Sequence, residues 1–182
     1  MLPKGLHPFI VDYDNVEATL SAGILGMVAN MTTNEQAQYV YECWDQFARS
    51  GRLDELVALY APDGAFESPL VPVLLQRDSG ICQGHEEMRR FFEEGFRRRP
   101  NELVRWWRNG RYHFDGSTLI WEYPGRSPEG DQLDLMEVME LRDGLIAHHK
   151  VYWGFRGVNE LLRSQRQKLV PNDSARGSRA SA

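Results

Sequence analysis

The sequence predicts an α+β fold in which a curved antiparallel sheet wraps around N-terminal helices to form a cone with an interior pocket. Helical periodicity dominates residues 34–96, and alternating periodicity dominates residues 102–153. Hairpin signals at Asp115-Gly116 and Asp143-Gly144 separate the later segments. Helices that precede hairpin-linked strands pack together on one face of the sheet.

Composition limits the class of protein. The 182 residues suffice for one domain with additional segments, and a net charge of −5 argues against a general nucleic-acid binder. No apolar run is long enough to span a bilayer, so no membrane association is expected. Cys43 and Cys82 have neither a metal-binding spacing nor a disulfide framework, and a reducing cytoplasm fits them.

The first half of the chain reads as helices. Asn34–Arg49 carries an amphipathic stripe that includes Tyr41 and Trp44, and Leu53–Tyr60 follows as a short helix. A turn at residues 61–64 leads to a short strand at residues 65–68 and a long loop at residues 70–84. Gly84–Phe96 is expected to be the third helix.

The second half reads as strands. Glu102–Arg108 and Arg111–Phe114 are expected to be parts of one strand, followed by strands at Thr118–Tyr123, Gly130–Leu141 and Leu145–Trp153. The cone domain then covers residues 33–157. Residues 1–32 are expected to be an N-terminal extension, with the hypothesis that the natural domain begins near Met31, and residues 158–182 are expected to be a largely disordered tail.

A carboxylate interrupts an apolar strand face. Leu133, Leu135, Met139 and Leu141 share one side of their strand with Glu137. An apolar setting makes Glu137 a candidate acid or base, and His149 on the next strand is its candidate partner. The alternative is structural: Glu137 bridges to Arg105, Arg108 or Arg111, and His149 is a satisfied core histidine. Strand parity also places a ligand-binding set inside the cone: Tyr41, Trp44, Phe66, Ser68, Leu119, Trp121, Tyr123, Leu135, Met139, Val151 and Trp153.

Four sequence phrases resemble the nuclear-transport-factor-2-like superfamily, which includes ketosteroid isomerase, scytalone dehydratase, limonene epoxide hydrolase and the SnoaL-like polyketide cyclases. The resemblance covers roughly residues 35–157, and the phrases are Asp54–Pro69, Gly84–Phe92, Trp121–Tyr123 and Asp143–Gly154. It implies the cone fold, but the fold hosts many chemistries.

The resemblance carries over only part of each known site. The general base of ketosteroid isomerase falls on Ser68 and its oxyanion tyrosine on Trp44, whereas its protonated carboxylic acid falls on Glu137. The last-strand aspartate of limonene epoxide hydrolase falls on Val151. Scytalone dehydratase uses histidines with tyrosines, for which His149 and Tyr41 are available. Steroid isomerisation and epoxide hydrolysis by these schemes are therefore not expected.

Two functions remain open. One is a cofactor-independent, metal-free lyase, isomerase or cyclase that acts on a small hydrophobic molecule with Glu137 and His149 as acid and base. The other is a non-catalytic ligand-binding or protein-interaction module with the same fold. A homodimer is expected through the open face of the sheet, which carries His148, Lys150 and Tyr152.

Overall fold

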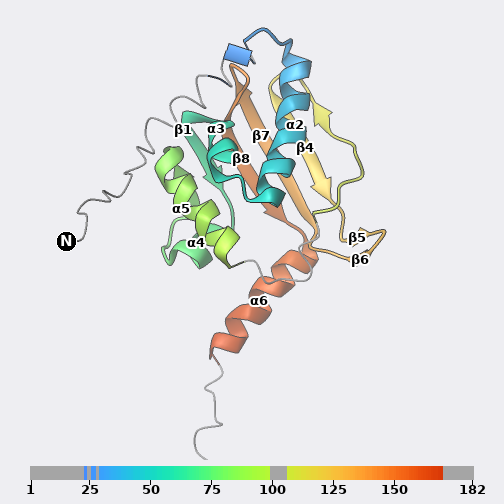
Figure 1. Ribbon diagram of the computed structural model, residues 1–182. Helices are drawn as coiled ribbons and strands as arrows, with labels where there is room; N and C mark the ends of the chain where they lie inside the picture. The colour runs from blue at the N-terminus through green and yellow to red at the C-terminus, as the bar shows by residue number, and fades with distance from the viewer. Residues whose placement is uncertain (1–22, 24–25, 28, 99–105, 170–182) are drawn as a thin grey trace, which may run out of the picture.

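The computed structural model describes residues 23, 26–27, 29–98 and 106–169. Its main sheet has six strands in the order β2-β1-β8-β7-β4-β3, and the helices α2, α3 and α5 lie across one face of it (Figure 1). The elements are α2 (Thr33–Ser50), α3 (Leu53–Ala58), β1 (Tyr60–Glu67), α4 (Leu70–Leu75), β2 (Ile81–Gln83), α5 (Gly84–Arg97), β3 (His113–Phe114), β4 (Thr118–Tyr123), β5 (Arg126–Ser127), β6 (Gly130–Asp131), β7 (Leu135–Arg142), β8 (Leu145–Trp153) and α6 (Phe155–Leu169). The predicted α+β class is confirmed.

Local sequence signals fix the ends of α2. Thr32 and Glu35 form a reciprocal capping box, which satisfies backbone N–H groups at the start of the helix. Gly51 ends the helix in the left-handed conformation with φ of 69°. The predicted stripe faces the sheet, where Tyr41 and Trp44 are buried.

The sheet is mixed, which corrects the antiparallel prediction, because β1 pairs in parallel with β8. β1 is also longer than the predicted strand and includes the predicted turn at residues 61–64. The register shifts between Tyr60 and Ala65, so the turn-like residues form an irregularity within the strand. Gly64 is needed there, because a Cβ at this position would lie 2.9 Å from the backbone oxygen of Ala61 and 3.0 Å from that of Ile146.

Other boundaries differ from the predictions. The predicted loop at residues 70–84 contains α4 and β2, and Trp106–Arg108 is not a strand. The predicted strand Gly130–Leu141 is divided, because Gly130 and Asp131 pair with β5 in a separate hairpin and β7 begins at Leu135. Residues 102–105 lie outside the described residues.

The predicted disordered tail is wrong at its start, because α6 runs from Phe155 to Leu169. Asp134 anchors this helix: its backbone oxygen accepts from the Gly154 N–H at 2.8 Å, and its side chain accepts from the Gly157 N–H at 3.0 Å. Residues 170–182 and most of the predicted extension 1–32 lie outside the described residues.

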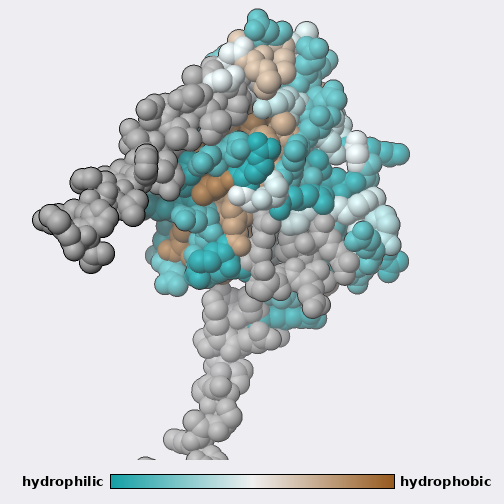
Figure 2. Space-filling model, viewed as in Figure 1, coloured by the Kyte–Doolittle hydropathy of each residue, from teal (hydrophilic) through white to brown (hydrophobic). Residues whose placement is uncertain are grey.

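The helical side of the molecule shown in Figure 2 is largely hydrophilic, with small hydrophobic areas. This is expected for helices whose apolar faces pack on a sheet. Among the described residues, none of the helices combines the length and apolar character that crossing a membrane requires. On the opposite face of the sheet, Tyr152 is 51% exposed and Met136 is 41% exposed. Dimerisation through that face stays a prediction.

Candidate functional site

Four buried side chains form a continuous hydrogen-bonded chain between α2 and the sheet. Trp44 Nε1 lies 2.8 Å from the Tyr60 hydroxyl, which lies 2.7 Å from His149 Nδ1. His149 Nε2 lies 2.5 Å from Oε2 of Glu137. The structure therefore brings the predicted pair, Glu137 and His149, into direct contact. We call these four residues the Trp44–Glu137 chain.

Donor and acceptor chemistry gives this chain a direction. An indole N–H only donates, so the Tyr60 oxygen accepts from Trp44 and its proton is left for His149 Nδ1. His149 then carries its own proton on Nε2 and donates it to Glu137. In this arrangement every donor has an acceptor, and Glu137 is a carboxylate.

Sheet register explains how the sequence assembles the chain. Phe66, His149, Met139 and Leu119 form one cross-strand row on the inner face of the sheet, and Val151, Glu137 and Trp121 form the next. His149 and Glu137 are thus diagonal neighbours on adjacent antiparallel strands, close enough for long side chains to meet. Tyr60 joins them from the first position of β1.

The chain is enclosed. The side chain of His149 is 0% exposed and that of Glu137 is 2% exposed. Oε1 of Glu137 has no hydrogen-bond partner among the described residues. Burial, reinforced by the negative charge of Glu137, raises the pKa of Tyr60 well above its ordinary value, so this phenol stays protonated. Both ring nitrogens of His149 are occupied by hydrogen bonds, one to Tyr60 and one to Glu137.

Aromatic rings surround the His149 imidazole. Trp44 and Phe66 meet it edge-on at centroid distances of 5.3 Å and 5.0 Å, and Tyr60 stacks at 6.0 Å. These rings exclude water, which strengthens the electrostatic interactions within the chain.

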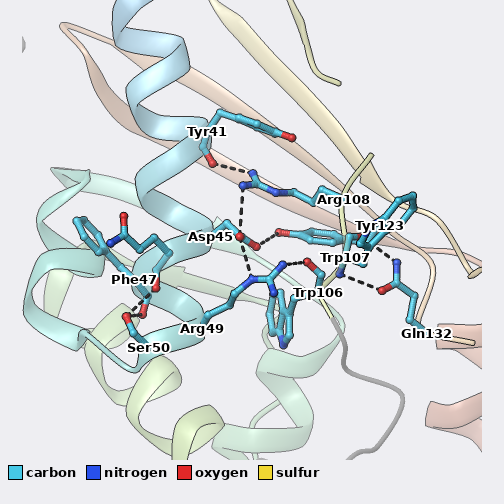
Figure 3. A network of polar contacts seen from close by, with 11 residues as sticks. Tyr41, Asp45, Phe47, Arg49, Ser50, Trp106, Trp107, Arg108, Tyr123 and Gln132 are labelled. Carbon is cyan, nitrogen blue, oxygen red and sulfur yellow. Dashed lines mark hydrogen bonds and ion pairs between the residues drawn. The ribbon is translucent and has the colours of Figure 1, made fainter. Parts of the chain in front are cut away.

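A second polar network, shown in Figure 3, lies beside the first and centres on Asp45 of α2. Its carboxylate pairs with Arg49 at 2.9 Å and with Arg108 at 3.3 Å, and accepts from the Tyr123 hydroxyl at 3.4 Å. Arg108 also donates to the backbone oxygen of Tyr41 at 2.7 Å and lies 3.8 Å above the Tyr41 ring. Of the arginines proposed as alternative partners of Glu137, Arg108 is thus occupied elsewhere. Arg105 lies outside the described residues.

Sequence reasoning missed Tyr60 and Asp45. Tyr60 was assigned to the apolar stripe of a helix, whereas α3 ends at Ala58 and Tyr60 opens β1. Asp45 is a charged residue outside the apolar stripe of its helix, yet it is only 9% exposed. Its spacing of four from Tyr41 was the signal, because residues four apart share a helix face.

Two cavities border the predicted ligand-binding residues. A groove of about 370 Å³, which we call the β8 groove, is lined by Ser68, Val151 and Trp153 together with Glu67, Pro69, Gly80, Lys150, Tyr152 and Val158. A second cavity of about 490 Å³ includes Tyr123, Leu135 and Trp153 in its wall. Neither is lined by Glu137 or His149. In the part of the chain that the structure describes, no cluster of three or more His, Cys, Asp or Glu side chains could hold a metal ion.

The remaining predicted ligand residues are core residues in this structure. Tyr41, Trp44, Phe66, Leu119, Trp121 and Met139 are each at most 7% exposed, and all belong to the main hydrophobic cluster. Side chains thus fill the inner end of the cone.

Solved structures with the same fold include a SnoaL-like protein of unknown function from Burkholderia thailandensis (18% identity, TM-score 0.52, covering 66% of this chain and 95% of that one). A candidate isomerase from Bacillus subtilis matches with 18% identity and a TM-score of 0.53, covering 73% of this chain and 96% of that one. An NTF2-like protein of unknown function from Burkholderia pseudomallei matches with 15% identity and a TM-score of 0.50, covering 73% and 97%. At these identities the likeness shows the fold alone.

A search of the curated proteins gives no match. The family model for the SnoaL-like domain matches residues 37–149, which span α2 to β8 and include all four members of the Trp44–Glu137 chain. The chain therefore belongs to the SnoaL-like domain family.

Proposed function

We propose that this protein is a cofactor-independent enzyme of the lyase, isomerase or cyclase type that moves a proton on a small, mostly apolar molecule. The observation that carries the proposal is the contact between His149 and Glu137 among aromatic side chains, in which the carboxylate uses Oε2 and leaves Oε1 outside the hydrogen bond. A buried carboxylate with a free oxygen is suited to accept a proton from a bound substrate.

The geometry supports different roles for the two residues. Glu137 Oε1 is the atom that would take and return the proton. His149 has no free ring nitrogen, so it acts through Glu137: its Nε2–H bond orients the carboxylate and stabilises its charge. His149 is in this proposal a positioning residue, and Glu137 is the catalytic one.

Substrate would approach along the β8 groove. The pairing of β1 with β8 ends at Glu67 and Lys150, so Val151–Trp153 have a neighbouring strand only on the β7 side. Val151 lines the groove and is also the register partner of Glu137. The groove thus reaches the residue beside the catalytic carboxylate, and a volume of about 370 Å³ is sufficient for a small ligand.

Deuterium exchange tests the proposal without knowledge of the natural substrate. The purified protein is incubated in D₂O with 2-tetralone, a compact apolar ketone with acidic C–H bonds, and deuterium uptake is followed by NMR above the buffer rate. Glu137→Gln keeps the shape but removes the base, so the exchange rate should fall at least about 100-fold.

Glu140→Gln is the matched control, because Glu140 lies on the same strand and its side chain is 56% exposed. It should exchange deuterium at the wild-type rate. Equal exchange rates in wild type and Glu137→Gln would contradict the proposed role of Glu137.

A second function is favoured by one observation. The Trp44–Glu137 chain is almost fully buried, and each hydrogen-bond donor in it has an acceptor, as in a purely structural network. In that case the protein is a non-catalytic binding module. Glu137→Gln would then change stability or binding, and the wild-type protein would exchange no deuterium above the buffer rate with 2-tetralone or with other small ketones.

A further inference from the structure

Helix α6 exposes a row of large apolar side chains to solvent. Phe155 is 78% exposed, Leu162 is 51% exposed and Val158 is 43% exposed. Their spacing of i, i+3 and i+7 places them on one face of the helix. We call these three residues the α6 stripe. A contiguous apolar patch on the surface of a soluble protein usually marks a site of interaction with a protein or a membrane.

The packing of α6 on the sheet explains why the stripe is uncovered. The helix meets the sheet through Gly157, which is buried, and a Cβ at this position would lie 2.6 Å from a ring carbon of Trp153. Asp134 holds the same turn through the N–H groups of Gly154 and Gly157. Beyond this turn the helix extends away from the sheet (Figure 1), which leaves the stripe exposed.

The charge of α6 is opposite in sign to that of the whole protein. Its basic residues are Arg156, Arg163, Arg166 and Lys168, and its acidic residue is Glu160. The helix thus has a net charge of +3 in a chain of net charge −5. Arg156 is paired with Asp131 at 2.7 Å. Glu160 is two positions from both Val158 and Leu162, so it lies on the side of the helix opposite the stripe.

We propose that α6 binds the surface of an anionic membrane. It lies in the plane of the interface, with the α6 stripe between the headgroups and the acyl chains and the basic side chains among the anionic headgroups. A narrow apolar face, basic residues beside it and low overall hydrophobicity are the features of such interfacial helices. An interfacial helix needs neither the length nor the uniform apolarity of a spanning helix, so the lack of a spanning run in the sequence does not bear on it.

Charge favours a membrane over a second copy of the helix. If the α6 stripes of two copies packed together, two helices of net charge +3 would lie side by side and repel each other. An anionic bilayer attracts the basic residues and also accepts the apolar ones. The helix is about 22 Å long, which exceeds two Debye lengths of about 8 Å each, so salt screens its far end from the acidic remainder of the protein.

The position of the stripe links the membrane to the β8 groove. Val158 belongs to the α6 stripe and also lines the groove. With α6 in the interface, the groove opens next to the lipid, and an apolar molecule dissolved in the bilayer reaches it without passing through water. This consequence for substrate delivery rests on the proposed function, whereas membrane binding by α6 does not.

Flotation of the full-length protein with liposomes tests the proposal. Wild type should float with vesicles of phosphatidylcholine mixed with phosphatidylserine and stay in solution with vesicles of phosphatidylcholine alone. Leu162→Ser should weaken binding roughly tenfold, because it removes a large side chain from the apolar layer. Arg163→Glu should weaken binding at least about fivefold, and NaCl at about 0.5 M should do the same, because both reduce the attraction to anionic headgroups.

Phe155→Ser is a second stripe variant at the first position of α6, in case a change in the middle of the helix unfolds it. It should also weaken binding roughly tenfold. Two substitutions outside α6 are matched controls and should bind as wild type does. Ile81→Ser removes an apolar side chain that is 42% exposed on β2, and Arg111→Glu reverses the charge of an exposed arginine.

Three results would overturn the proposal: wild type stays in solution with the anionic vesicles, it binds equally well without phosphatidylserine, or both stripe variants bind as wild type does. A dimer in light scattering that Phe155→Ser dissociates, without vesicle binding, would also overturn it and assign the stripe to a contact between copies. Vesicle binding without deuterium exchange would retain the membrane site and remove the proposed catalysis. Exchange without vesicle binding would do the reverse.

Discussion

At Tyr60 one hydroxyl group serves two buried partners. It accepts from Trp44 at 2.8 Å and donates to His149 at 2.7 Å. Because the indole has only a donor, it determines which way the phenol proton points, and through it which nitrogen of His149 carries the proton. Trp44 of α2 thereby influences where the proton lies at Glu137. Among the described residues, Trp44 and Glu137 have no direct hydrogen bond to each other.

Tyr60→Phe should destabilise the protein by roughly 2–3 kcal/mol, because it leaves the Trp44 N–H and His149 Nδ1 buried without partners. Urea unfolding at pH 7 measures the loss. Tyr152→Phe makes the same chemical change at a side chain that is 51% exposed and should alter the free energy of unfolding by less than about 0.5 kcal/mol. Equal stabilities of the two variants would show that the Tyr60 hydrogen bonds contribute nothing.

At the scale of elements, strand β1 combines an irregular start with a regular end. The register shift after Tyr60 lets Tyr60 pair with Ile146 while Phe66 pairs with His149. Without the extra residues, Tyr60 and His149 could not both belong to the inner face at their observed positions. The segment that looks like a turn in the sequence thus aligns the two halves of the site.

Gly64→Ala should destabilise the protein by about 1–3 kcal/mol, because the new methyl group would press on the backbone oxygens of Ala61 and Ile146 at 2.9 Å and 3.0 Å. Thermal or urea unfolding measures the effect. Gly80→Ala is the control, since its Cβ would meet nothing closer than 3.7 Å. If Gly64→Ala were as stable as Gly80→Ala, the backbone around residue 64 would accommodate a methyl group without a loss of stability, contrary to the prediction.

Sequence patterns predicted the long elements and the inner face well. The helices α2 and α5 and the strands β4 and β8 follow from periodicity and end signals, and strand parity placed Glu137 and His149 on the same side. Parity could not predict their contact, because a diagonal neighbour depends on register. Tyr60 was not predicted as a site residue, because it continues the apolar helical stripe of Leu53, Leu56 and Val57. The stripe does not reveal that the helix ends at Ala58. The sequence patterns did not predict the parallel pairing of β1 with β8, because these strands are far apart in the chain.

At the scale of the whole molecule, a buried thiol makes stability depend on pH in the alkaline range. Cys82 in β2 is 0% exposed, and burial raises the pKa of its thiol from 9.0 to about 11. A folded-state pKa above the unfolded value means that the unfolded chain releases its proton first as pH rises. The stability that the buried thiol contributes is fully present below pH 9 and is lost between pH 9 and about pH 11.

Cys82→Ala should therefore show a smaller fall in the free energy of unfolding between pH 9 and 11 than the wild type does. Urea titrations at pH 8, 9, 10 and 11 measure the two curves. Between pH 7 and 8 the difference between the proteins should stay constant. Parallel curves up to pH 11 would show that the thiol does not titrate differently in the folded and unfolded states.

The parallel pairing of β1 with β8 has a consequence for how the chain acquires its structure. Tyr60 and His149 are 89 residues apart in sequence, and β8 is the last strand of the sheet. During synthesis α2 to α5 and β1 emerge long before β8 can be inserted between β1 and β7. Until then β1 and β2 have only each other, and the apolar face that will surround Glu137 is open to water. Contacts of such long range slow folding and prolong the exposure of unpaired strand edges. The nascent protein is thus most vulnerable to aggregation just before the residues of its site meet.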